Sequence, residues 1–194
     1  MKVLIAGAGI GGLTTALMLH ARGIPVQIYE TAAEVREAGV GINILPHAIR
    51  ELETLGLLPA LDVVGLRTRR LTYYTRSGQE VWSELRGTYA GHEVPQFSIH
   101  RGRLQHLLYK AVLDRLGPKA VQTGRRLGGF VQDDKGITAH FANSIDGSKG
   151  ITVRGDVLIC CDGIHSAGRK VFYPNEKSPS WNGVMMWRGA VDWP

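Results

Sequence analysis

Cysteine is scarce in this chain of 194 residues: there are only two, Cys160 and Cys161, and they are neighbours. Adjacent cysteines rarely reach acceptable disulfide geometry, and no Cys or His spacing in the sequence is typical of a metal site. We therefore expect no disulfide framework and no metal centre. Because both cysteines lie in an apolar run, we expect them to be small buried hydrophobic residues.

Long apolar runs are also lacking, since none reaches the length of a membrane span. The first twenty residues begin like a signal peptide, with Lys2 before an apolar stretch. Glycines interrupt that stretch at four positions, however, and a signal core has no need of them. We therefore expect a cytoplasmic protein with no membrane partner.

Acidic residues are fewer than basic ones, 17 against 23, which gives a net charge of +6. The Lys and Arg residues are scattered, so we expect a solvated surface that mildly favours anionic ligands, and no nucleic-acid partner. Hydrophobic residues make up 44% of the chain, enough for a packed core. The 25 glycines, many at the ends of apolar runs, suit an α/β protein with tight strand-to-helix turns.

Periodicity and turn residues predict the order of elements. A strand–helix–strand unit opens the chain, and hairpin patterns appear in two later regions. The predicted strands or extended segments cover 2–6, 25–29, 39–45, 156–161 (buried) and 183–194. The predicted helices cover 13–22, 46–55, 58–63, 101–116 and 166–172. The predicted hairpins cover 69–86 and 121–141.

The first strand–helix turn carries a phosphate-binding pattern, Gly7-Ala-Gly-Ile-Gly-Gly12, which fits G-x-G-x-x-G. Gly7 permits the tight turn, Gly9 lets a pyrophosphate approach the backbone, and Gly12 lets the helix pack on the strand. Gly11 belongs to the same loop and is a further candidate cofactor-binding residue. The helix N-terminus then offers N–H groups and partial positive charge to the phosphates.

Glu30 ends the second strand about twenty residues further on, where a carboxylate accepts hydrogen bonds from both ribose hydroxyls. A negative charge there would repel a 2′-phosphate and so disfavours NADP in this pocket. This unit alone does not separate FAD from NAD, because both contain ADP. A glycine-rich turn without a ligand is the alternative interpretation.

Three further segments carry a family resemblance: residues 39–46, 98–107 and 156–166. With them the sequence resembles the FAD-dependent aromatic hydroxylases, the single-component flavoprotein monooxygenases. Their order and intervals make the combination specific. Residues 81–87, 98–102 and 186–189 are most similar to the phenazine-modifying members of that family.

The resemblance implies a Rossmann-like FAD-binding domain of the glutathione-reductase type, an α/β fold whose parallel sheet is joined by a β-meander. This domain is expected over 1–68 and 97–172, with part of a β-sheet substrate domain over 69–96 and 173–194. The family's third fingerprint, a Gly-Asp-Ala-Ala-His-Pro-like segment, is not in the sequence. We therefore expect an incomplete chain that does not hydroxylate a substrate by itself.

The resemblance also assigns roles to residues. Arg101 is implied to reach the FAD pyrophosphate or ribityl region, which suits a guanidinium fork; a surface salt bridge is the alternative. Asp162 and Gly163 are implied to lie near the pyrophosphate and riboflavin, and the alternative is a plain Asp-Gly turn. Gly41 and Asn43 are implied to line the approach to the flavin.

Leu127 is implied to touch the adenine end of the cofactor, with plain strand core as an equal alternative. The sequence departs from the family pattern at two places. Cys160-Cys161 replaces a smaller Gly-Ala pair, so local packing must adjust. Gly168 stands where an apolar residue is usual, which weakens the helix start and puts the position of Arg169 in doubt.

The implied chemistry belongs to the cofactor. NADH or NADPH reduces the flavin, O₂ then gives a C4a-hydroperoxide, and an aromatic or heteroaromatic substrate attacks it while the protein excludes water. No catalytic side chain is therefore expected. The four histidines at 92, 100, 106 and 165 are expected to be structural or surface residues.

Two other functions stay open on the sequence. An NAD-dependent dehydrogenase shares the first unit, but it predicts a compact parallel sheet filling the first 150 residues instead of the hairpins. A non-catalytic dinucleotide-binding module predicts FAD or NAD binding without turnover. The sequence also leaves open whether the chain forms a homodimer.

Overall fold

The structure is a computed structural model and describes residues 1–187 and 189. The chain forms two compact units, the first from residues 1–36 and 108–186 and the second from 37–107 with the segment that begins at Trp187. Helix α4 (Arg101–Leu116) starts in the second unit and ends in the first. The predicted division into FAD-binding and substrate domains is a functional one and stays a prediction.

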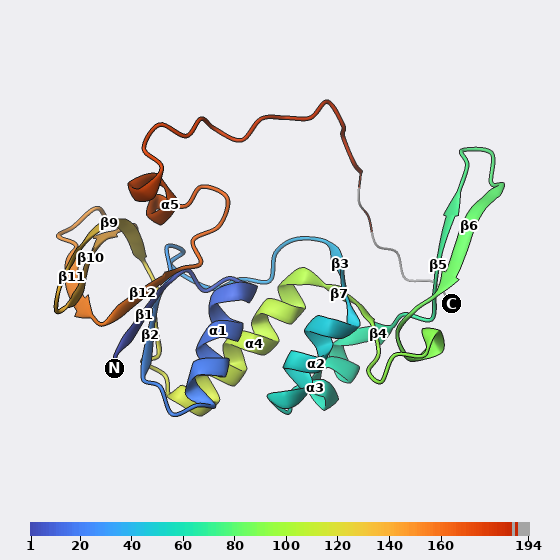
Figure 1. Ribbon diagram of the computed structural model, residues 1–194, viewed down its shortest axis with the longest axis horizontal. Coiled ribbons are helices and arrows are strands. Elements are labelled where there is room, and N and C mark those ends of the chain that lie inside the picture. The colour runs from blue at the N-terminus through green and yellow to red at the C-terminus, as the bar shows by residue number, and fades with distance from the viewer. Residues whose placement is uncertain (188, 190–194) are drawn as a thin grey trace. The chain divides into compact units, whose positions relative to one another are not determined.

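A four-stranded parallel sheet is the centre of the first unit (Figure 1). Its order is β12-β1-β2-β8, and its strands are β1 (Val3–Ala6), β2 (Val26–Tyr29), β8 (Val121–Gln122) and β12 (Val157–Cys160). In the paired register, β1, β2 and β12 end together at Ala6, Tyr29 and Cys160. In such sheets ligands bind outside the carboxyl ends of the strands, so this edge is where a site is expected.

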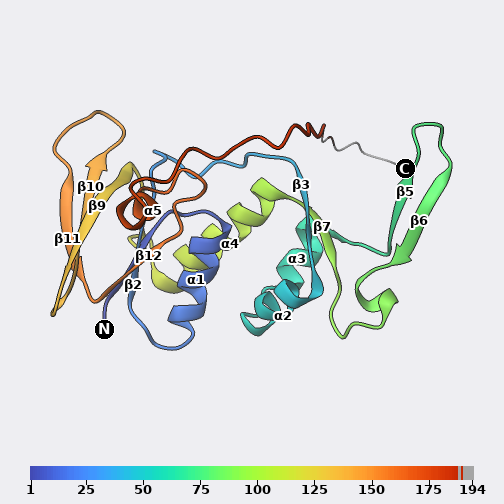
Figure 2. The same ribbon diagram turned by 45° about the horizontal axis from the view of Figure 1, so that its top comes forward.

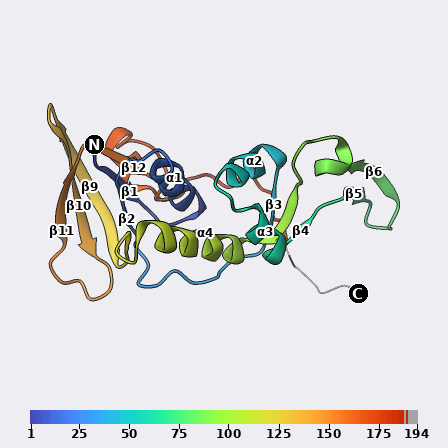
Figure 3. The same ribbon diagram turned by 90° about the horizontal axis from the view of Figure 1, so that it is seen from below.

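An antiparallel meander packs on one face of the parallel sheet, and α1 (Ile10–His20) lies on the other (Figure 3). The meander has the order β11-β10-β9, from β9 (Arg125–Asp133), β10 (Gly136–Asn143) and β11 (Ile151–Gly155). Apolar side chains of both sheets form one buried cluster. Within it the rings of Tyr29 and Phe141 stack with centroids 4.2 Å apart.

Helix α1 begins at Ile10, three residues before the predicted start, and Gly9 is its N-cap. The boundary was wrong because a glycine-rich segment was expected to be loop throughout, whereas here the loop itself turns into the first helical turn. Gly12, Leu13, Ala16 and Leu17 are the buried positions of the helix. Their spacing follows the helical period that the sequence predicted.

The second unit contains a three-stranded antiparallel sheet, a pair of short helices and a hairpin (Figure 2). The sheet has the order β3-β7-β4, from β3 (Gly41–Ile44), β4 (Gly65–Arg67) and β7 (Phe97–His100). The helices are α2 (Pro46–Thr54) and α3 (Leu58–Val64). The hairpin pairs β5 (Arg70–Tyr74) with β6 (Glu80–Leu85), and a 3₁₀ turn, η1 (Gly87–Ala90), follows it.

Both predicted hairpins are confirmed, as β5–β6 and β9–β10, with turns at Gly78 and at residues 133–136. A compact parallel sheet over the first 150 residues, which the dehydrogenase alternative predicts, is therefore wrong. Strands β4, β7 and β11 were not predicted. They have only three, four and five residues, so the alternation in β7 and β11 is too brief to stand out in the sequence.

Two predictions about the end of the chain are corrected. The strand at 156–161 was expected to be buried, but β12 is an edge of its sheet, with Val157 and Cys160 exposed. Residues 183–187 and 189 form no strand. The other residues of the strand predicted to 194 lie outside the described residues, and so does residue 188 of the 186–189 segment. Across the part of the chain that the structure describes, no helix has the length and apolar character that a membrane crossing requires.

Candidate functional site

The glycine turn lies at the carboxyl edge of β1, and two of its glycines are sterically required. Gly7 has φ +101°, and its N–H donates to the Tyr29 carbonyl at 2.7 Å. A Cβ at Gly7 would collide with the Cys161 carbonyl oxygen, and one at Gly12 would collide with the Gly7 carbonyl oxygen. Any larger residue would therefore push the turn away from the sheet.

Contacts within the protein do not explain why glycine occupies positions 9 and 11. A Cβ at either position would meet nothing within 4 Å, so the protein itself does not require glycine there. No side chain caps the N-terminus of α1, which leaves its first N–H groups oriented towards the open space in front of the loop. This is the cradle in which a diphosphate can approach the backbone closely.

Glu30 holds this loop with its carboxylate. Oε2 accepts a hydrogen bond from the Ala8 N–H at 2.6 Å, and Oε1 accepts one from the Ala32 N–H at 2.8 Å. The Glu30 backbone is fixed as well, because its N–H donates to Gln122 and its carbonyl accepts from Arg125. An ionised carboxylate has about four acceptor sites, so both oxygens keep capacity for the hydroxyls of a ribose.

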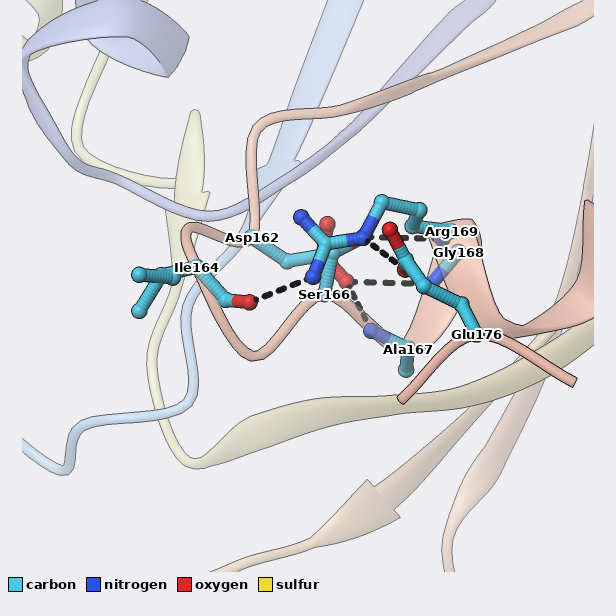
Figure 4. Close-up of polar contacts among 7 residues, drawn as sticks. All are labelled: Asp162, Ile164, Ser166, Ala167, Gly168, Arg169 and Glu176. Carbon is cyan, nitrogen blue, oxygen red and sulfur yellow. Dashed lines mark hydrogen bonds and ion pairs between the residues drawn. The ribbon is translucent and has the colours of Figure 1, made fainter. Parts of the chain in front are cut away.

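Asp162 follows the neighbouring strand β12 and begins the loop that leads to α5 (Ala167–Phe172). Its Oδ2 accepts hydrogen bonds from the N–H groups of Ala167 at 2.7 Å and Gly168 at 3.2 Å (Figure 4). Its Oδ1 is buried and accepts no hydrogen bond from the described residues. A buried carboxylate oxygen without a donor is unfavourable, so this atom points to a ligand hydroxyl or N–H.

The loop around Asp162 is fixed by its own side chains (Figure 4). Ser166 caps α5 by accepting a hydrogen bond from the Arg169 N–H at 2.9 Å. The Arg169 guanidinium donates to the Ile164 carbonyl at 2.9 Å and pairs with Glu176 at 2.7 Å. The sequence left the position of Arg169 in doubt. Its side chain closes this loop, and among the described residues it makes no hydrogen bond or ion pair with the glycine turn.

The two departures from the family pattern compensate one another. A Cβ at Gly168 would collide with the Cys160 sulfur, so the larger residue in β12 is accommodated by the missing side chain in α5. Cys160 is nevertheless exposed as a residue and Cys161 is half-buried, which corrects the expectation that both are buried. Burial, with Asp162 second, raises the pKa of the Cys160 thiol to about 11, and burial also raises the pKa of Cys161.

The remaining predicted site residues lie in other places. Leu127 is buried in the core between the two sheets of the first unit, where the plain-core interpretation puts it. Gly41, Asn43 and Arg101 belong to the second unit. There Gly41 pairs with His100, directly before Arg101, and the Asn43 Oδ1 accepts a hydrogen bond from Ser98 at 2.7 Å.

Arg101 is packed tightly at the start of α4. Its N–H donates to the Val40 carbonyl at 3.0 Å, and a Cβ at Gly39 would lie 2.7 Å from its Nε. The guanidinium makes none of the ion pairs found among the described residues, and the residue is exposed. The surface salt bridge given as its alternative is therefore not seen in that part of the chain.

The first unit thus brings together seven of the predicted residues: Gly7, Gly9, Gly11, Gly12, Glu30, Asp162 and Gly163. Open glycines, an uncapped helix N-terminus and two fixed carboxylates fit an ADP-containing dinucleotide. The profile of the FAD binding domain family matches residues 1–182. The chain belongs to the FAD binding domain family.

Proteins with known activities fit this assignment. The chain is 44% identical over 191 residues to the phenazine 1,6-dicarboxylic acid hydroxylase of Lysobacter antibioticus, covering 98% of this chain and 47% of that one. It is 34% identical to the aurachin C monooxygenase/isomerase of Stigmatella aurantiaca, covering 99% and 48%. The chain therefore spans about half the length of the curated relatives that it matches.

Solved structures agree with the fold. Klebsiella pneumoniae HpxO, determined with FAD and uric acid, superimposes with a TM-score of 0.71 and 30% identity over 88% of this chain and 41% of that one. The α/β architecture with a parallel sheet and a meander is that of an FAD binding domain, as predicted. The sequence reasoning missed the backbone donors of Ala8 and Ala32, because no side-chain pattern marks an N–H that holds a carboxylate.

Proposed function

We propose that this chain is the FAD-binding part of an FAD-dependent monooxygenase that hydroxylates an aromatic or heteroaromatic ring, using NADH or NADPH and O₂. The observation that carries the proposal is the open glycine turn between Glu30 and the unpartnered Oδ1 of Asp162, at one edge of one sheet. The relatives support it, since their names describe a phenazine hydroxylase and an aurachin monooxygenase.

The proposed roles follow from the contacts. The N–H groups at the start of α1 bind the pyrophosphate, and the small Gly9 and Gly11 let it approach. Glu30 accepts hydrogen bonds from ribose hydroxyls while it holds Ala8. The Asp162 Oδ1 accepts one from a hydroxyl of the riboflavin side.

Residues of the second unit complete the proposal. Gly41 and Asn43, which lie on one strand, border the flavin, and Arg101 donates to the cofactor from the start of α4. When bound, FAD supplies the redox chemistry of nicotinamide oxidation and oxygen activation. The side chains bind, orient and exclude water, so no nucleophilic Ser or Cys is required. We also propose a cytoplasmic location, because the reaction consumes NAD(P)H.

The test uses the complete gene product that contains these residues, beside residues 1–194 alone. The gene product is expected to retain FAD and to oxidise NADH or NADPH in a substrate-dependent way, with an oxygen atom from ¹⁸O₂ in the product. Residues 1–194 are expected to bind FAD without turnover. Absence of flavin binding by the gene product would overturn the proposal, and bound flavin without oxygen transfer to any aromatic substrate would favour the non-catalytic module.

A further inference from the structure

The arginines of the second unit differ in whether the protein itself balances their charge. A pocket of about 430 Å³ lies between the start of α2, the end of β6 and the η1 turn, and Arg50 and Arg86 line it. Both are paired, Arg50 with Glu93 and Arg86 with Glu84. Arg101, in contrast, makes no ion pair with any described residue. Of these three charges, that of Arg101 is the one available to an anion from outside the protein.

The backbone of residues 37–40 lies directly against the start of α4. The Arg101 N–H donates a hydrogen bond to the Val40 carbonyl at 3.0 Å. A Cβ at Gly102 would lie 2.5 Å from the backbone nitrogen of Ala38. Because that neighbour is backbone and not the end of a side chain, glycine at position 102 is what lets the two segments approach so closely.

Gly39 is the residue of this segment that lies against the Arg101 side chain. Its φ of +113° is a conformation that residues with a side chain rarely adopt. A Cβ at Gly39 would lie 2.7 Å from the Arg101 Nε and 3.3 Å from its Cζ. The guanidinium therefore occupies the space that a side chain at position 39 would take, and any other residue there displaces it.

The imidazole of His100 holds the same glycine. Its Nε2–H donates a hydrogen bond to the Gly39 carbonyl at 2.9 Å, since a carbonyl oxygen can only accept. Its Nδ1 is buried and has no hydrogen-bond partner among the described residues. The backbone of His100 is fixed as well, because it pairs with Gly41 across β3 and β7. The ring is thus committed to the Gly39 carbonyl.

We propose that Gly39 and His100 are positioning residues for Arg101. The hydrogen bond from His100 holds the Gly39 peptide in place, and the missing side chain at Gly39 leaves the guanidinium where it binds FAD. The inference rests on the proposed function, which assigns Arg101 to the cofactor, and it adds two residues that act through Arg101 without touching the cofactor themselves.

A double-mutant cycle on FAD affinity, measured by equilibrium dialysis with the apoprotein of the complete gene product, tests this. Arg101→Met is expected to weaken FAD binding by about ten- to hundredfold, as for a lost hydrogen bond to a charged group. Gly39→Ala is expected to weaken it by about tenfold, within the same range. In the Arg101→Met background Gly39→Ala should change the affinity by less than about twofold, because the group that it displaces is already gone.

Two further comparisons separate positioning from a general loss of structure. Gly56→Ala is the matched control, since Gly56 also has a positive φ, +69°, and a Cβ there meets no protein atom within 4 Å. It should lower stability and leave FAD affinity unchanged. His100→Gln keeps an N–H donor at the place of Nε2 and should retain most of the FAD affinity, whereas His100→Leu should lose affinity several-fold.

A loss in Gly39→Ala that disappears without Arg101 would support the inference. Full FAD affinity in Gly39→Ala, or additive losses in the cycle, would overturn it and leave the proposed function standing. Equal affinities of His100→Gln and His100→Leu would overturn the role of His100. If Gly39→Ala does not fold, His100→Leu takes its place in the cycle.

The same measurements distinguish this inference from the proposed function. Full FAD affinity in Arg101→Met would overturn the role of Arg101 and the inference, but not FAD binding by the glycine turn. A gene product that binds no FAD would overturn the proposed function and the inference together.

Discussion

The glycine turn of the first unit and the pocket of the second are lined by different kinds of groups. At the glycine turn the donors are backbone N–H groups, and the carboxylates of Glu30 and Asp162 are themselves held by backbone N–H groups. In the pocket the charged groups are the side chains of Arg50, Glu84 and Arg86, which come from segments far apart in the sequence.

The most direct test of this difference is a glycine substitution, which alters the backbone site without changing any polar group. Gly12→Ala is expected to lower the free energy of unfolding by about 3 kcal/mol, the upper end for overpacking, because its Cβ meets a carbonyl oxygen that cannot move aside. Thermal and denaturant unfolding measure the loss.

Gly11→Ala is the matched control in the same helix turn. Its Cβ meets no protein atom, and alanine favours a helix by up to about 1 kcal/mol over glycine. Stability should therefore stay the same or rise, while FAD affinity falls because the methyl group occupies the cradle. Unchanged FAD affinity in Gly11→Ala would show that the open space in front of the turn is not the ligand site, and equal destabilisation by both substitutions would show that this space is not open.

The same contrast explains what the sequence could predict. A backbone phosphate site requires glycines at fixed positions, so Gly7 and Gly12 were readable as a motif, and Glu30 followed from its distance along the chain. The pocket is lined by residues such as Arg50 and Arg86, which are 36 positions apart and brought together by folding. No local spacing marks such a pair.

Helices and strands with several residues of clear periodicity were the easiest to predict from the sequence. The helices and the β5–β6 hairpin have clear periodicity or turn residues, whereas β7 has only four residues directly before α4 and was not predicted. The burial of Cys160 was wrongly predicted because an apolar run suggests a central strand. The sequence alone does not show that β12 lies at the edge of its sheet, where β1 is its single neighbour among the described strands.

A second prediction concerns the carboxylate that links the backbone site to its ligand. Glu30→Gln replaces one acceptor oxygen by an NH₂ group, which cannot accept from the N–H of Ala8 or Ala32. The free energy of FAD binding is expected to weaken by about 1.5–3 kcal/mol, the range for hydrogen bonds to a charged group. Equilibrium dialysis of FAD measures it.

Glu34→Gln is the control for this charge change, since Glu34 is exposed in the following segment and pairs only with Arg36 among the described residues. It should leave FAD affinity unchanged. Full FAD affinity in Glu30→Gln would mean that Glu30 does not contribute to binding. An equal loss in both variants would mean that Glu30 acts through net charge alone. Either result would refute the ribose role.

A smaller effect is expected where the two departures from the family pattern meet. Gly168→Ala should destabilise the protein by about 1 kcal/mol, less than Gly12→Ala, because the atom it meets is a side-chain sulfur that can shift. Cys160→Ala removes that sulfur, so the double variant should recover most of the loss. A double-mutant cycle on the free energy of unfolding gives the coupling; additive effects would show that the two residues do not compensate.

The smallest expected effect is on thiol chemistry beside the glycine turn. Burial, then Asp162 and Cys161, hold the pKa of Cys160 near 11, against an ordinary value of 9.0. A raised pKa means that the folded state keeps its proton longer than the unfolded state. The resulting stability is therefore fully present below about pH 9 and is lost as the pH rises through about 11.

Alkylation by iodoacetamide in the Cys161→Ala variant, followed from pH 7 to pH 12 by mass spectrometry, measures the Cys160 thiolate directly. The rate should stay low at neutral pH and reach half its maximum near pH 11. A midpoint at or below 9 would mean that the thiol is not desolvated and that the Gly168 contact is absent in solution. A thiol that stays protonated at neutral pH is a poor nucleophile, which agrees with the proposal that the chemistry belongs to a bound cofactor.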